Sequence, residues 1–136
     1  MDYSQIIIGL LSGGAIVTIV QHFLDRRKEI QSKESELKEK RYKCILLLMY
    51  ALINPEELKS INRIRPELST KEDLEKEIKT ELVNAWLFAG DKTVKELENF
   101  MKNPCEESFA KTILSMRKEL WNRRTKLEPK EFKLNI

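Results

Sequence analysis

The sequence predicts an all-α protein: one N-terminal transmembrane helix continuing into a charged stalk helix, then a cytosolic bundle of four or five helices. Three observations predict this class. The chain opens with an uncharged apolar segment, apolar residues then recur at three- and four-residue spacing, and only 4 Gly and 4 Pro interrupt 136 residues. A content of 41% hydrophobic and 35% charged residues excludes a disordered or collagen-like chain. The expected parts are an anchor at 1–24, a stalk at 25–43 and the bundle at 44–136.

The anchor is predicted from Tyr3 to Leu24, where no residue is charged. As a helix this segment would be about 33 Å long, enough for the roughly 30 Å hydrocarbon core of a bilayer. A cleaved signal peptide needs a basic start, whereas this chain begins Met1-Asp2. The alternative, a buried helix of a soluble bundle, has to explain the consecutive isoleucines Ile6–Ile8 and an apolar surface all round the helix.

The orientation of the anchor follows from its flanking charges. Arg26, Arg27 and Lys28 follow it, and no Lys or Arg precedes it. Positive flanks stay in the cytoplasm, so we expect a single-pass membrane protein with the N-terminus outside and the C-terminal domain cytoplasmic. The same three cations are candidates for contact with anionic membrane lipid.

Small residues in the anchor are candidates for helix packing. Gly9 and Gly13 form a GxxxG motif, and Gly14 widens the patch. Such patches let two helix backbones approach closely, which predicts a homo-oligomer. The alternative is that glycine is simply common in membrane helices.

The stalk, 25–43, contains no Gly or Pro and has glutamates four residues before lysines, an order that stabilises isolated helices. These pairs are Glu29–Lys33, Glu34–Lys38, Glu36–Lys40 and Glu39–Lys43. Apolar residues at seven-residue spacing make half of a coiled-coil seam, from Phe23 through Ile30 and Leu37 to Cys44. A solvated stalk and a true coiled coil both remain open.

The apolar segment Cys44–Ile53 is too short to cross a membrane and is predicted to be the central core helix. Because the next helix breaker is Asn54-Pro55, one helix is expected to run from near Tyr3 to Ile53. Asn54 can cap the following short helix and Pro55 suits its first position. That helix is expected to direct Leu58, Ile61 and Ile64 inward.

Three further helices are predicted from caps and apolar spacing. A capping box at Ser69–Asp73 begins the first, which ends at Gly90, and Asp91 caps the next. The last helix follows Asn103-Pro104, and the tail 131–136 is a candidate strand. Expected inward residues are Leu74, Ile78, Leu82, Ala85, Trp86, Ala89, Val94, Leu97, Phe100 or Met101, Phe109, Ile113, Met116 and Leu120.

The residues needed for catalysis are scarce. His22 is the single histidine, Cys44 and Cys105 are far apart, and no Gly-rich phosphate loop occurs. We therefore predict no catalytic residue, no metal ligand and no cofactor. A net charge of +3 argues against binding to duplex nucleic acid.

A basic cluster near the end of the last predicted helix is the remaining candidate site. It consists of Arg117, Lys118, Arg123, Arg124 and Lys126 around Trp121. Arg117, Arg123 and Arg124 are the candidates for an anionic ligand, such as a nucleotide-like molecule, or for lipid. The alternative is that these cations only complement the helix dipole and keep the surface soluble.

The layout carries loose motifs: Lys40-Arg41-Tyr42, Trp86-x-Phe88-Ala89-x-Asp91 followed by Val94, and Met116-Arg117-Lys118-x-Leu120. With these, most of the chain resembles small bacterial single-pass membrane proteins with a charged helical stalk and a cytosolic α-helical domain. Similar layouts include membrane effectors of antiphage defence, which accompany cyclic-oligonucleotide, type III CRISPR or short Argonaute systems. The resemblance implies a cytosolic domain that controls a membrane-damaging oligomer.

The leading functional hypothesis is a non-enzymatic inner-membrane protein that self-assembles and transmits a cytosolic ligand or partner signal to the membrane, as an antiphage effector does. The alternative is a passive tether or adaptor that recruits a cytosolic protein partner. A third hypothesis, an enzyme of unfamiliar type, would be supported by a copurifying nucleotide or metal.

Overall fold

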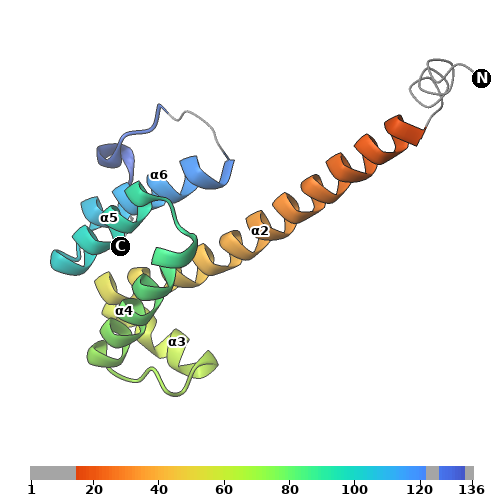
Figure 1. Cartoon of the computed structure of the whole chain (residues 1–136). Coiled ribbons are helices and arrows are strands. Elements are labelled where there is room, and N and C mark those ends of the chain that lie inside the picture. The colour runs from red at the N-terminus through yellow and green to blue at the C-terminus, as the bar shows by residue number, and fades with distance from the viewer. Residues whose placement is uncertain (1–14, 122–125, 134–136) are drawn as a thin grey trace, which may run out of the picture. The chain divides into compact units, whose positions relative to one another are not determined.

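The computed structural model describes residues 15–121 and 126–133. Its elements are α2 (Ala15–Ile53), η1 (Pro55–Glu57), α3 (Leu58–Ile64), α4 (Lys71–Phe88), α5 (Asp91–Lys102), α6 (Glu106–Trp121) and η2 (Pro129–Glu131) (Figure 1). The described part is therefore all-α, as predicted. The candidate strand at 131–136 is wrong at Glu131, which ends a 3₁₀ turn that Pro129 begins. Residues 134–136 lie outside the described ranges.

The predicted anchor lies mostly outside the described residues, which begin at 15. Gly9, Gly13 and Gly14 lie outside them as well. Among the helices that the structure describes, none contains a stretch long and apolar enough to span a bilayer.

The chain divides into two units, Met1–Leu37 and Lys38–Ile136. In the first, every side chain of α2 from Val17 to Leu37 is exposed to solvent. One predicted ion pair, Glu29–Lys33, forms there with an Nζ–Oε1 distance of 2.9 Å. This half of the helix is thus supported by its own backbone and local side-chain pairs.

The second unit has one hydrophobic core built from α2, α3, α4, α5 and α6. Its buried members are Tyr42, Ile45, Leu48, Met49, Ala51, Leu52, Ile61, Leu68, Leu74, Ile78, Ala85, Leu97, Phe100, Phe109 and Met116. The apolar segment Cys44–Ile53 does lie at the centre of this core, although Cys44 and Leu47 are exposed. Burial begins at Tyr42, which lies within the segment that the sequence indicated as stalk.

Two residues predicted to face inward are exposed instead. Trp86 is 68% exposed because Ala85, its neighbour on α4, takes the core position in line with Ile78. Successive helix residues are about 100° apart, so the two cannot share a face. Ile64 is 78% exposed at the last position of the short helix α3, where Ile61 alone is fully buried.

Capping chemistry explains the helix boundaries. The predicted capping box begins α4: Thr70 Oγ1 accepts from the Asp73 N–H at 3.2 Å, and Asp73 Oδ2 accepts from the Thr70 N–H at 3.0 Å. Asp91 does not cap α5, because it is the first helical residue and Gly90 occupies the N-cap position. A Cβ at Gly90 would lie 3.2 Å from Glu119 Oε2, so glycine permits a close approach to α6.

Candidate functional site

The carboxylate of Glu119 on α6 accepts four hydrogen bonds. Oε1 accepts from Lys38 Nζ at 2.7 Å and from the Gly90 N–H at 2.9 Å. Oε2 accepts from the Tyr42 hydroxyl and from Thr93 Oγ1, both at 2.8 Å. Since only 18% of the Glu119 side chain is exposed, these four donors replace most of its hydration. We call this arrangement the Glu119 clamp.

Three helices supply the clamp. Lys38 and Tyr42 lie four residues apart on α2, which places both on one face of that helix. Tyr42 is fully buried and its ring packs against Phe88 of α4, with ring centroids 5.7 Å apart. Gly90 is the N-cap of α5, and Thr93 lies in its first turn. The clamp therefore joins the part of α2 that starts the second unit to the α5–α6 pair.

The electrostatics of the clamp favour the ionised form of the Glu119 carboxylate. Burial raises the pKa of Glu119, but the bonds from Lys38, Thr93, Tyr42 and the Gly90 N–H outweigh it, and the net pKa is lowered. Burial, with the hydrogen bond and charge of Glu119, raises the pKa of the Tyr42 phenol. Tyr42 thus remains a protonated donor and Glu119 an ionised acceptor at neutral pH.

The clamp continues toward the surface through two hydroxyl groups. Thr93 Oγ1 and Ser115 Oγ, both buried, are 2.8 Å apart. Because the one proton of the Thr93 hydroxyl goes to Glu119, Ser115 is the donor in this bond. Farther along, the Thr112 hydroxyl lies 2.9 Å from the Ser108 carbonyl of its own helix and 3.3 Å from the Glu96 carbonyl of α5. In these contacts the residue numbers rise along α5 as they fall along α6, so the two helices are antiparallel.

Ser115 also lines a cavity of about 460 Å³ between α5, α6 and the C-terminal segment. The other lining residues are Lys92, Glu96, Lys111, Leu114, Lys118, Leu127 and Pro129. We call this space the lysine cavity. Its wall is thus connected to the Glu119 clamp by the Ser115–Thr93 bond.

A second partly buried carboxylate lies between α2 and α4. Glu81 Oε1 receives a long contact of 3.4 Å from Arg41 Nη1. Glu81 Oε2 is buried and has no hydrogen-bond partner in the described part of the chain. Compared with Glu119, this pair is weakly satisfied.

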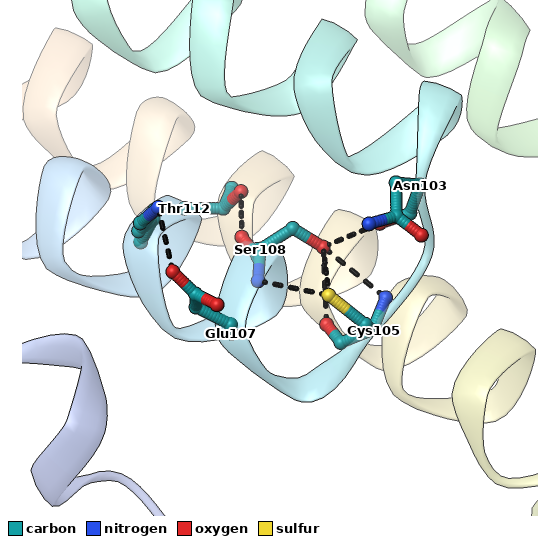
Figure 2. Close-up of polar contacts among 6 residues, drawn as sticks. Asn103, Cys105, Glu107, Ser108 and Thr112 are labelled. Atoms are coloured by element: carbon teal, nitrogen blue, oxygen red, sulfur yellow. Dashed lines mark hydrogen bonds and ion pairs between the residues drawn. The ribbon is translucent and has the colours of Figure 1, made fainter.

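The cysteine at the start of α6 has a structural role (Figure 2). Ser108 Oγ accepts from the Cys105 N–H at 3.2 Å and donates to the Asn103 carbonyl at 2.8 Å. The Ser108 N–H points to Cys105 Sγ at 3.5 Å. Bonds from the Ser108 side chain and backbone lower the pKa of Cys105. These contacts are those of an N-terminal helix cap, so helix capping explains a cysteine at this position.

The structure places the predicted site residues separately. Arg26, Arg27 and Lys28 are exposed on α2, and Arg117 is exposed on α6. Arg123 and Arg124 lie outside the described residues. Of the basic cluster, Lys118 lines the lysine cavity, while Lys126 and Trp121 are exposed.

The remaining candidates for chemistry are also dispersed. His22 is exposed on α2, and Cys44 and Cys105 are free thiols. No group of three or more metal-binding side chains occurs among the residues of 15–121 and 126–133.

Sequence reasoning missed Glu119, although one signal was present. Glu119 follows Thr112 and Met116 at helical spacing on the inward face of α6, where an acidic residue needs buried donors. The donors themselves lie far away in the sequence. Lys38 in particular has Glu34 four residues before it, and the sequence therefore predicted a local ion pair between these two residues.

The comparisons with known proteins add no family assignment. No known protein family, curated protein sequence or solved structure matches this chain. The site is therefore interpreted from its own contacts.

Proposed function

We propose that this chain is a non-enzymatic inner-membrane protein that self-assembles and transmits a cytosolic signal to the membrane, acting as a membrane-disrupting effector of antiphage defence. The observation that carries the proposal is the Glu119 clamp. It fixes Lys38 and Tyr42, and the same helix α2 begins at Ala15, within the predicted anchor segment 1–24. A change at the clamp therefore acts on the helix that leads to the anchor.

The mechanism has two states of the clamp. In the described state, Glu119 holds α2 against α5 and α6 through Lys38, Tyr42 and Thr93. In the second state these bonds are released and the α2 segments rearrange in the oligomer. A trigger favours one state only if it binds the two states with different affinity. A ligand in the lysine cavity can bind them differently, because Ser115 in the cavity wall is bonded to Thr93 of the clamp.

The non-enzymatic part of the proposal is supported by how the reactive groups are used. Cys105 caps a helix, and Glu119 is saturated by four donors with its pKa lowered. A general acid or base works best with a pKa near the working pH and with a free position for the substrate. Glu119 meets neither condition, because its pKa is lowered and its four acceptor positions are occupied.

The test is induced expression of the full chain in bacteria, followed by membrane fractionation, a membrane-potential dye and the native mass of the detergent extract. We expect a membrane-bound oligomer that depolarises cells. The Glu119→Gln variant should depolarise at a different expression level, whereas Glu107→Gln, an exposed carboxylate on the same helix, should behave as the wild type. A harmless membrane-bound monomer, or a chain absent from the membrane fraction, would contradict the proposal.

The second candidate, a tether or adaptor, is favoured by a surface of α4. Val83, Trp86 and Leu87 are exposed there at helical spacing. Exposed apolar groups of this kind occur where protein partners bind. Replacing residues 1–24 with an unrelated transmembrane helix distinguishes the candidates, because an adaptor should keep its activity and an effector should lose it.

A further inference from the structure

We propose that the lysine cavity binds a small phosphate-bearing molecule that also carries an apolar group, such as an aromatic phosphomonoester. The cavity is the one bounded by Lys92, Lys111, Lys118, Leu114 and Leu127. Its role as the place where the trigger binds rests on the proposed function. Binding of a phosphate compound to the cavity does not depend on the proposed function.

The charges of the lining residues select an anion. Lys92 of α5 and Lys111 and Lys118 of α6 face one space, against a single glutamate, Glu96. Lys111 also pairs with Glu107 at 2.9 Å. Neither Lys92 nor Lys118 forms an ion pair within the described ranges. Two helices thus place Lys92, Lys111 and Lys118 around one space that has a single glutamate, an excess of positive charge that favours an anion.

A neighbouring cavity shows that this charge excess is local. That cavity, of about 580 Å³, also includes Lys111 and Pro129, but its charged lining residues are balanced. They are the glutamates Glu106, Glu107 and Glu128 and the lysines Lys111, Lys130 and Lys133. Three charges of each sign give no preference for an anion. The excess of positive charge, and with it the preference for an anion, therefore lies on the side of α6 that carries Lys118.

The apolar part of the lining selects more than a bare phosphate. Leu114, Leu127 and Pro129 contribute hydrocarbon surface beside the lysines. A volume of about 460 Å³ lies in the range of small-molecule sites, which are mostly apolar with a few placed polar groups. Inorganic phosphate would leave most of this surface in contact with water. A ring or short chain attached to the phosphate would cover it.

The position of Ser115 links occupancy of the cavity to the clamp. Ser115 is one of the lining residues, and its hydroxyl donates to Thr93, which donates to Glu119. A ligand phosphate that accepts the Ser115 proton removes it from Thr93. The hydroxyl chain that supports Glu119 is then interrupted at its first member, and Ser115→Ala should imitate that interruption.

The test measures binding of phenyl phosphate to the full chain in dodecyl maltoside by isothermal titration calorimetry. We expect saturable binding that inorganic phosphate only weakly reproduces. The double variant K92Q with K118Q should bind at least about tenfold more weakly, because charged hydrogen bonds to the phosphate are lost. Glu96→Gln should bind more tightly, since it removes the one negative charge of the lining. The matched control Lys95→Gln alters an exposed lysine of α5 outside the cavity and should not change affinity.

A parallel experiment with vesicles containing phosphatidic acid distinguishes the source of the phosphate. Loss of vesicle binding in the double variant, without binding of soluble phenyl phosphate, would identify a lipid headgroup as the ligand. Equal binding by the double variant and the wild type in both experiments, or no binding in either, would overturn the inference. Because depolarisation of cells is measured independently, failure of phosphate binding and failure of the proposed function give different results.

Discussion

The two halves of helix α2 have opposite surroundings. From Val17 to Leu37 every side chain is exposed, including apolar ones such as Phe23. From Tyr42 to Leu52 the same helix contributes Tyr42, Ile45, Leu48, Met49, Ala51 and Leu52 to the buried core. One continuous helix is thus specified by local i,i+4 pairs and helix-forming residues in its first half and by tertiary packing in its second.

This difference explains why helical periodicity alone does not locate the domain. Both halves lack Gly and Pro, so both are good helix formers. What separates them is contact with distant parts of the chain, such as the bond between Lys38 and Glu119. The boundary between the units lies at that residue, before the apolar segment begins.

The largest expected effect comes from truncating side chains on the two halves. Met49→Ala should lower the free energy of unfolding by about 2–5 kcal/mol, because Met49 is 0% exposed and a cavity would replace it. Leu37→Ala, at a side chain 64% exposed, should change it by less than about 0.5 kcal/mol. Urea unfolding of both variants measures the difference. Equal losses would mean that the first half is packed as tightly as the second.

The next effect concerns the clamp. Glu119→Gln removes the negative charge that accepts hydrogen bonds from Lys38 and Tyr42. It should destabilise the second unit by about 2 kcal/mol. Its control, Glu107→Gln, disrupts an exposed pair with Lys111 and should change the stability much less, because water screens that pair. The same urea transitions give both values. If the two variants were equally stable, the clamp would contribute no more than a surface ion pair.

The stability of the clamp should depend on acid pH. The folded pKa of Glu119 is below its ordinary value of 4.5, so its contribution is complete above that pH. As the pH falls below 4.5 the unfolded chain takes up the proton first, and the contribution is lost as the pH passes through the folded value. The stability difference between wild type and Glu119→Gln should therefore shrink in this range. A difference that stayed constant down to pH 2 would contradict the assignment.

The sequence predicted the helices well because their signals are local. The Thr70–Asp73 capping box, Pro55 at a first helical position and the apolar spacing of α5 all act within a few residues. The clamp was not predicted because its bonds join residues 26 to 81 positions apart. Ala85 and Trp86 were both predicted to face inward because both lie at helical spacing from Leu82, but only Ala85 is buried.

A smaller effect is expected at the start of α4. Thr70→Ala removes the hydroxyl that accepts from the Asp73 N–H and should cost about 1 kcal/mol. Thr80→Ala is the control, because the Thr80 hydroxyl is exposed and donates within its own helix to the Lys76 carbonyl. Thermal unfolding of the two variants compares a capping hydroxyl with one in the helix interior. A melting temperature unchanged by Thr70→Ala would show that Asp73 alone maintains the cap.

The smallest effect on the second unit should come from breaking the first half of α2. Ser35→Pro removes a backbone hydrogen bond and costs about 3 kcal/mol of local helix stability, but no side chain from Val17 to Leu37 is buried. Hydrogen exchange of the core around Met49 should therefore match that of wild type and of the control Ser35→Ala. In cells the same break should reduce depolarisation, because the clamp then acts on a helix that no longer reaches the anchor intact. Faster exchange around Met49 would instead show that the two halves of α2 fold as one cooperative unit. The two halves would then differ in how exposed their side chains are, but not in stability.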